Sequence, residues 1–303
     1  MLPKPRRRWY QFSLFTLLIG LTLFSLPLGY IAWEREQCRR GDEAVDILRQ
    51  NPEIIVGWHW VRDSQFNRPK WLTFILGDET FRKVDGAYLV GDSVSDSDLR
   101  LLALLPNLTI VQIKAPNVTD AGVSHLRSLR SVEVLSIESN LKVSATTWEV
   151  PREWHQLYSL SLLGTQFGDE DVLRIQGLTN LERLDLSRTN ITDAGLEGLL
   201  SLQNLSSLQL HGTQISDAGL VHLKKLTNLK YLDLSDTEIT DAGLAQLRSL
   251  RNLESLRLAR TNVSDAGLQY LKHLEKLKYL DLDATGVTTS GVANLEKSLP
   301  NAF

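Results

Sequence analysis

The sequence is poor in the residues that most often build catalytic and metal sites. Cys38 is the only cysteine, so the chain can form neither an intramolecular disulfide nor a metal site made of several cysteines. None of the patterns GxxxxGK[ST], HExxH, GxSxG or CxxC occurs, and the six histidines are scattered along the chain. The sequence therefore predicts a protein that is not an enzyme and that holds no cofactor or metal ion.

The chain also lacks a strong excess of charge of one sign. It carries 33 Lys and Arg against 36 Asp and Glu, which gives a formal net charge of -3. The acidic excess lies after residue 82, whereas the segment before it is slightly basic. Because nucleic-acid binding relies on clustered basic residues, this distribution argues against a nucleic-acid partner.

Only one long hydrophobic run is present, over residues 9–33, which contain no charged residue. As a helix, this run would be about 37 Å long, more than the roughly 30 Å of a bilayer's hydrocarbon core. Aromatic residues at both of its ends suit the two membrane interfaces. We therefore expect a basic tail at residues 1–8 and a transmembrane signal anchor at 9–33. The alternative is a cleaved signal peptide, although the run is longer than a usual h-region and no A-x-A site follows it.

The charges that flank this run favour one orientation. Lys4 and the arginines at 6–8 precede it, whereas Arg35, Arg39 and Arg40 follow it. The positive-inside rule then predicts a cytoplasmic N-terminus, by a narrow margin. In that orientation, the remainder of the chain lies outside the cytoplasm.

Residues 34–82 are predicted to form a juxtamembrane segment and an N-terminal cap. The segment GDEAVDILRQ indicates a helix whose first turn Asp42 would cap. The segment EIIVGWHWV, residues 53–61, is typical of a strand. Two short helices are expected in KWLTFILG and DETFRKV, at 70–77 and 78–84.

From residue 83 to residue 303, the chain repeats a phrase of 24 residues, clearest in NLERLDLSRTNITDAGLEGLLSLQ at 180–203. We expect nine copies, and the copy at 131–155 is degenerate. Within a copy, Leu184 and Leu186 alternate as a strand residue facing the core does. Thr189 recurs at the strand's end, and we expect its hydroxyl to bond backbone groups of adjacent turns.

The second half of each copy indicates a helix. Asp193 is expected to cap that helix, and Leu196, Leu199 and Leu202 lie on one of its faces. A row of such aspartates could suggest calcium, but most copies lack further carboxylates at ligand spacing. Gly195 is expected to permit close approach between neighbouring turns.

This phrase resembles the leucine-rich repeat LxxLxLxxCxxITDxGLxxL, here with Thr in place of Cys, and about 220 residues share the resemblance. The resemblance implies an α/β solenoid shaped like a horseshoe, with short parallel strands on its concave side and helices on its convex side. An N-terminal transmembrane helix followed by such repeats is similar to bacterial single-span membrane-anchored leucine-rich repeat proteins. No catalytic residue is implied by the family.

Three copies depart from the phrase, including the one that follows residue 155, where Gly-Asp-Glu-Asp at 168–171 replaces Thr-Asp-Ala-Gly. The copy at 131–155 loses the Asp and the helix signal after Ile137, and its Trp148 and Trp154 are candidate contact residues because irregular loops on rigid scaffolds often carry function. Simple decay of one copy is the alternative. The last copy has Thr-Thr-Ser-Gly where Asp is expected, which indicates a C-terminal cap.

Equal positions of neighbouring copies should form columns about 4.8 Å apart across the concave face. Tyrosine and arginine are favoured interface anchors, so these columns are the predicted binding surface for a protein partner or, as a weaker candidate, a glycan. Opposite charges that neutralise one another across strands are the alternative explanation, and a structural envelope spacer without a specific ligand is the alternative function. The candidate partner-binding residues are Arg183, Asp185, His211, Tyr231, Asp233, Arg257, Tyr279, Asp281, Trp148 and Trp154.

Overall fold

The computed structural model describes residues 32–33, 36–37, 39–59, 83–105, 107–138, 143, 154–300 and 302. The chain divides into two compact units, Met1–Glu43 with Arg68–Phe81, and Ala44–Asn67 with Arg82–Phe303. No helix within the described residues combines the length and apolarity that a membrane crossing requires. The predicted anchor lies almost wholly outside those residues, as do most of the two short helices predicted at 70–84.

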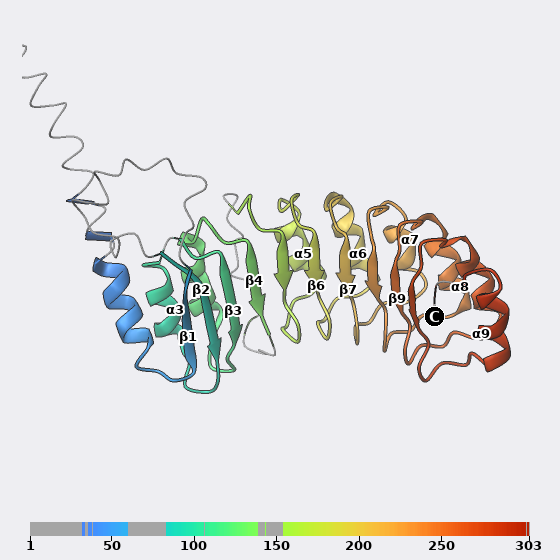
Figure 1. Ribbon diagram of the computed structural model, residues 1–303, viewed down its shortest axis with the longest axis horizontal. Coiled ribbons are helices and arrows are strands. Elements are labelled where there is room, and N and C mark those ends of the chain that lie inside the picture. The colour runs from blue at the N-terminus through green and yellow to red at the C-terminus, as the bar shows by residue number, and fades with distance from the viewer. Residues whose placement is uncertain are drawn as a thin grey trace, which may run out of the picture. The chain divides into compact units, whose positions relative to one another are not determined.

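The larger unit is built on one continuous ten-stranded sheet in which the strands follow chain order (Figure 1). The first two strands, β1 and β2, pair antiparallel, and every later pair is parallel. From β2 onward, one strand lies in the first part of each predicted copy. The strands are β1 Ile54–His59, β2 Lys83–Val90, β3 Ile110–Lys114, β4 Val134–Ile137, β5 Ser159–Ser161, β6 Arg183–Asp185, β7 Ser207–Gln209, β8 Tyr231–Asp233, β9 Ser255–Arg257 and β10 Tyr279–Asp281.

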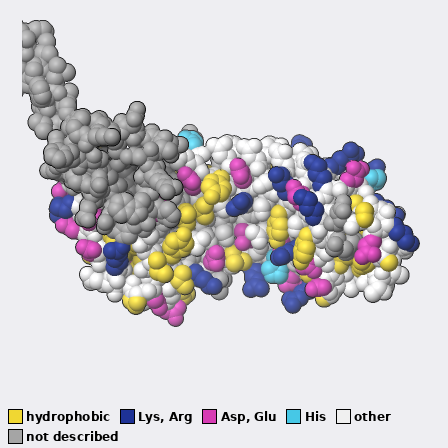
Figure 2. Space-filling view, viewed as in Figure 1, with side chains coloured by type: hydrophobic (Ala, Val, Ile, Leu, Met, Phe, Trp, Pro, Cys, Tyr) yellow, Lys and Arg dark blue, Asp and Glu magenta, His cyan; other side chains and the backbone are white. Residues whose placement is uncertain are grey.

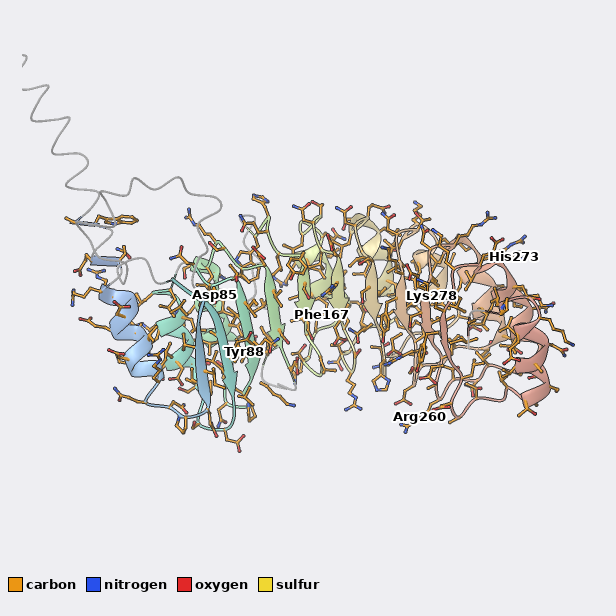
Figure 3. The ribbon with its side chains drawn as sticks, viewed as in Figure 1. Asp85, Tyr88, Phe167, Arg260, His273 and Lys278 are labelled. Carbon is orange, nitrogen blue, oxygen red and sulfur yellow. The ribbon has the colours of Figure 1, made fainter. Side chains whose placement is uncertain are left out.

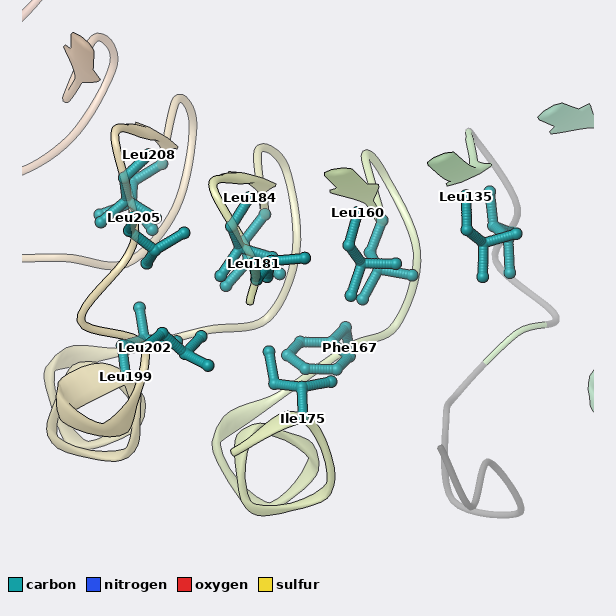
Figure 4. Packing of buried hydrophobic residues seen from close by; sticks show 14 of the residues in the cluster. Leu135, Leu160, Phe167, Ile175, Leu181, Leu184, Leu199, Leu202, Leu205 and Leu208 are labelled. Carbon is teal, nitrogen blue, oxygen red and sulfur yellow. The ribbon is translucent and has the colours of Figure 1, made fainter. Parts of the chain in front are cut away.

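Short helices lie on the other side of the core from the sheet (Figure 4). They are too short to be stable alone, so packing against neighbouring copies holds them. The helices are α3 Asp96–Leu102, α4 Asp120–Ser124, η2 His125–Ser128, α5 Asp169–Ile175, α6 Asp193–Gly198, η3 Leu199–Ser201, α7 Leu220–Leu223, α8 Asp241–Leu244, η4 Ala245–Ser249, η5 Gly267–His273 and α9 Thr289–Glu296.

The core is a stack of leucines between the strands and the helices. Leu184 on β6 and Leu186 directly after it are buried, and so are Leu196, Leu199 and Leu202 from the helical half of the same copy. Burying a leucine completely contributes about 1.5–3 kcal/mol, and each copy buries its leucines only against its neighbours. The leucine pattern therefore requires the stack.

The buried threonine column follows a different bonding rule from the predicted one. Thr189 donates its hydroxyl hydrogen to the Leu186 carbonyl oxygen, 2.6 Å away, within its own copy rather than to an adjacent one. Three residues separate donor and acceptor, so the bond closes the turn that ends the strand. The same bond recurs at Thr165, Thr213, Thr237, Thr261 and Thr285.

The aspartate that recurs between copies also has a different role from the predicted cap. The α6 helix is capped by Thr192, whose hydroxyl accepts from the Ala194 N–H. Asp193 reaches the next copy, where its carboxylate accepts from the Ser216 N–H at 2.8 Å and the Ser216 hydroxyl at 2.5 Å. A side chain at the first helical position points back over the preceding turn and is free to make this bond. We call this bonding of an aspartate carboxylate to a Thr or Ser of the next copy a staple. The staples are Asp96–Thr119, Asp169–Thr192, Asp193–Ser216, Asp217–Thr240, Asp241–Ser264 and Asp265–Thr288.

The glycine prediction is confirmed, because the staple needs the space that glycine leaves. A Cβ at Gly219 would lie 2.2 Å from the Asp193 Oδ1 atom of the preceding copy. The same conflict would arise at Gly122, Gly195, Gly243, Gly267 and Gly291.

The N-terminal end of the sheet agrees in part with the prediction. The strand predicted at 53–61 is β1, which covers the outer edge of β2. Residues 39–48 are helical, so Asp42 lies inside the helix and the prediction that it caps the first turn is wrong. Ion pairs of Arg39 and Arg40 with Glu36, three and four residues apart, favour a helical conformation before Asp42. Lys83 and Val84, predicted as helix, belong to β2.

The degenerate copy does not interrupt the sheet, since Leu135 of β4 pairs with Leu160 of β5. The indole of Trp154 is 2% exposed, and its Nε1–H donates to the Leu129 carbonyl oxygen at 2.6 Å. The prediction that Trp154 contacts a partner is therefore wrong, because its ring fills the core where this copy lacks a leucine. Trp148 lies outside the described residues.

Candidate functional site

The parallel register aligns the predicted columns on the strand face that points away from the core. Each residue lies opposite its counterpart one copy later, as predicted from the 24-residue spacing. The first column is Arg183, Ser207, Tyr231, Ser255 and Tyr279. The second column is Asp185, Gln209, Asp233, Arg257 and Asp281.

Arg257 is the centre of these columns. Its guanidinium carbon lies 5.8 Å from the ring centroid of Tyr231 and 5.7 Å from that of Tyr279, so both rings attract the cation. One terminal nitrogen lies 3.8 Å from the Asp233 carboxylate. The Nε atom of Arg257 is buried and has no hydrogen-bond partner among the described residues. The arginine is therefore held in place but keeps unused donor capacity.

The charges around Arg257 shift the pKa of two groups. Burial raises the pKa of Tyr231, and the nearby Asp233 carboxylate raises it further. Partial burial on its own lowers the pKa of Arg257, but the neighbouring Tyr231, Asp233, Tyr279 and Asp281 offset this effect, and the net pKa is raised. At neutral pH the tyrosine is therefore a neutral hydroxyl and the arginine a cation.

The aspartates of the second column have a structural bond of their own. Asp185 accepts from the Ser187 N–H at 2.9 Å, and Asp233 accepts from the Ser235 N–H at the same distance. Asp281 accepts from the Asp283 N–H at 3.1 Å. Each carboxylate thus closes the turn after its strand, which accounts for Asp in alternate copies without any ligand. Asp233 is only 6% exposed, so it acts mainly through Arg257 and this turn.

A hollow of about 640 Å³ opens beside these columns. It brings together five of the predicted residues, and it excludes Arg183, Tyr231 and Tyr279 from its lining. His211 lies in its wall, with Nδ1 3.2 Å from the Ser235 carbonyl oxygen. The charged and imidazole residues that line the hollow are Asp185, Arg188, His211, Asp233, Arg257, Arg260, Asp281 and Asp283.

Arg188 and Arg260 are the two basic lining residues that the sequence-based prediction missed. Both have positive φ, 54° and 57°, a conformation that glycine adopts without strain. Gly164 and Gly212 occupy the same position in other copies, with φ of 67° and 64°. In some copies the residue directly before the buried threonine is a glycine. These glycines were the signal in the sequence that the backbone adopts a positive φ at this position and turns away from the strand. Arg260 lies at the rim of the ribbon (Figure 3).

The face that carries the strands differs between its two halves. Apolar side chains gather over the N-terminal strands, and acidic and basic side chains intermingle towards the C-terminal strands (Figure 2). In the described part of the chain, no group of three or more His, Cys, Asp or Glu side chains is arranged to hold a metal ion. The charged and imidazole side chains that line the hollow can form hydrogen bonds and ion pairs with a bound molecule.

Comparisons with known proteins place two segments of the chain. Residues 177–200 and 203–263 each match a model of the family described as leucine rich repeat. No curated protein matches the chain.

Two solved structures of proteins from Listeria monocytogenes resemble the fold of this chain. An internalin, InlF, matches with a TM-score of 0.57 at 24% identity, over 71% of this chain and 59% of that one. The chain thus spans less than two thirds of that relative, and the likeness shows the fold alone. Internalin C2 matches with a TM-score of 0.47 at 27% identity, over 67% of this chain and 80% of that one.

Proposed function

The chain is a leucine-rich repeat protein, and on that premise we propose that its concave face binds a protein partner without catalysing a reaction. Solenoids of this kind offer extended concave surfaces, and interaction modules use them. The observation that carries the proposal is Arg257, held between two tyrosine rings beside the hollow. Tyrosine and arginine are enriched among the residues that dominate interface energetics. Side chains that are already held in place also lose less conformational entropy on binding.

The experiment that tests this proposal compares partner capture by the wild type and by a triple variant, Tyr231→Ala, Arg257→Ala, Tyr279→Ala. Proximity labelling of the full chain in its own cell should lose its most enriched protein in the triple variant. A specific observation favours the alternative of an envelope spacer: the arginine already has Asp233 and both rings as partners. Unchanged capture by the triple variant supports the spacer and contradicts recognition.

Two further variants separate loss of binding from loss of folding. Arg188→Gly and Arg260→Gly remove a guanidinium from the wall of the hollow and place glycine where positive φ favours it. The free energy of unfolding should therefore stay within about 1 kcal/mol of the wild type. Partner capture should fall if these arginines contribute to binding. Ala284→Gly is the matched control, because it has the same backbone conformation outside the hollow.

We further propose that residues 9–33 anchor the protein in a membrane and that the repeats lie outside the cytoplasm. The support is the uncharged run of 25 residues and the slight excess of basic residues before it. A reporter that is active only in the cytoplasm, fused to Phe303, should remain inactive. Strong reporter activity would contradict this orientation, and recovery of the chain in the soluble fraction would contradict the anchor.

A further inference from the structure

The stack of copies has an uncovered face at β10. In the four preceding copies, the second core leucine of the strand is fully buried by the copy that follows, whereas Leu282 is only partly buried. Val287 and Val292 are likewise partly exposed, although their counterparts Val263 and Leu268 are buried. A hollow of about 400 Å³ lies among these side chains, between β10 and α9. The apolar surface of this copy therefore lacks a cover among the described residues.

The backbone of β10 is unpaired on the same side. In the preceding copy, the N–H groups of Leu258 and Arg260 donate to carbonyl oxygens of β10 and its turn, at 2.9 and 2.8 Å. The corresponding N–H groups of Leu282 and Ala284 have no acceptor among the described residues. Unpaired donors beside an apolar hollow are the requirements for adding a strand to a sheet edge.

The acidic side chains at this edge favour an added strand that carries a basic residue. In the second column, Arg257 lies between Asp233 and Asp281, and both carboxylates raise its pKa. Among the described residues, no strand pairs with the outer edge of β10 beyond Asp281, and Asp283 lies exposed beside it. A second copy that paired through this edge would bring its own Asp281 and Asp283 to an edge that is already acidic, and like charges close together across strands are destabilising. The edge of β10 thus favours a basic side chain and disfavours pairing with the same edge of a second copy.

We infer that an extended segment of a protein partner adds to β10 as an eleventh, parallel strand. Its pattern is apolar, basic, apolar: two apolar side chains fill the hollow, and a Lys or Arg between them faces Asp281 and Asp283. This docking surface shares Asp281 and Asp283 with the lining of the concave hollow around Arg257, but its apolar part is the second hollow, between β10 and α9. The inference does not depend on the proposed function.

The chain itself supplies a probe of this chemistry. Residues 252–263, NLESLRLARTNV, contain the β9 strand with Arg257 between two leucines, and in the fold they pair in parallel with β10 and β8. The labelled synthetic peptide should bind the full chain saturably, with a Kd below about 1 mM by fluorescence anisotropy. The same peptide with Asp in place of its central Arg should bind at least about five-fold more weakly at low salt, with the difference shrinking as salt rises.

Variants of the chain locate the peptide. Val292→Trp fills the hollow between β10 and α9 and should abolish peptide binding. If this variant has a lower melting temperature than the wild type, Ala293→Trp is used in its place, because Ala293 is an exposed residue of the same lining. Asp281→Asn keeps the oxygen that accepts from Asp283 and should weaken binding about two- to five-fold through lost charge alone. Arg188→Gly, in the concave hollow, should leave peptide affinity unchanged.

Three results of the peptide measurements would overturn the inference. They are no saturable binding of the peptide, equal affinity of the Arg and Asp peptides, and unchanged affinity in the folded Trp variants. A concentration-dependent dimer in sedimentation velocity that Val292→Trp dissociates would also overturn it, since a second copy would then be the occupant. Failure of the triple concave variant to lose its partner bears only on the proposed function.

Discussion

At the residue scale, the glycine of the repeated phrase makes a sharp stability prediction. A Cβ at Gly243 would lie 2.2 Å from the Asp217 Oδ1 atom, so Gly243→Ala must displace the carboxylate that staples two copies together. We expect it to lower the free energy of unfolding by about 1–3 kcal/mol in urea denaturation, as overpacking does. Gly177→Ala is the control: nothing lies within 4 Å of its added Cβ, and the change should stay within about 0.5 kcal/mol. Equal effects in the two variants would contradict the staple.

The buried tryptophan of the degenerate copy gives a second prediction at this scale. Trp154→Ala should cost about 3–5 kcal/mol, because it empties a large core position and leaves the Leu129 carbonyl oxygen without its donor. Trp154→Phe keeps part of the volume and should cost less. Partner capture by the folded Phe variant should match that of the wild type. A variant that lost capture with unchanged stability would restore Trp154 as a contact residue.

The residues explain why some predictions succeeded and others failed. Leucines such as Leu184 recur with a fixed period, and residues at the same position of each copy face the same side. The period therefore predicts which side chains are buried. Trp154 belongs to the degenerate copy, whose residues do not follow the repeated phrase, so its place in the copy did not indicate that it is buried. The role of Asp193 was missed for another reason: it bonds to a residue 23 positions later, and capping is the local rule that the same residue type also satisfies.

At the scale of the element, the staple between neighbouring helices is sensitive to pH. Hydrogen bonds from the Thr288 hydroxyl and N–H hold the pKa of Asp265 below its ordinary value of about 3.9. Because the folded state lowers this pKa, the contribution of the staple to stability is complete above the ordinary value. It is lost as pH falls through the lowered pKa.

This staple gives a prediction for carboxyl NMR titration. Thr288→Ala removes the hydroxyl donor and should raise the pKa of Asp265 towards its ordinary value. Thr288→Ser should leave the pKa low, since Ser216 and Ser264 make the same bond in other copies. If the Ala and Ser variants titrate alike, the hydroxyl is not what lowers the pKa.

Elements also show which part of the site a sequence can predict. Parallel pairing at a fixed repeat length lines up Tyr231 with Tyr279 and Asp233 with Arg257, and a 24-residue count is enough to find these columns. The distances from Arg257 to the rings depend on side-chain conformations, which the count does not contain. The outward bend at Arg188 and Arg260 depends on backbone dihedrals that only the glycines of sister copies hinted at.

At the scale of the whole molecule, stability should depend on where in the stack a change is made. Leu256 and Leu280 occupy the same position of consecutive copies, but Leu256 is fully buried between two copies whereas Leu280 is 9% exposed beside the open face of β10. In a solenoid, each copy is stabilised by its own core and by its interfaces with neighbours. Leu280 therefore contributes through one such interface and Leu256 through two.

Leu256→Ala should accordingly lower the free energy of unfolding by about 2–5 kcal/mol, and Leu280→Ala by about half as much. Hydrogen exchange should show where each loss acts. Leu280→Ala should speed exchange in β10 and α9 alone, because the last copy can open without its neighbours. Leu256→Ala should speed exchange on both sides of β9. Saturating the protein with the Leu-Arg-Leu peptide should protect the β10 amides and raise the cost of Leu280→Ala towards that of Leu256→Ala, since an added strand gives Leu280 its second interface. If the two variants already cost the same without peptide, the face of β10 is covered by another part of the chain and no strand is needed there.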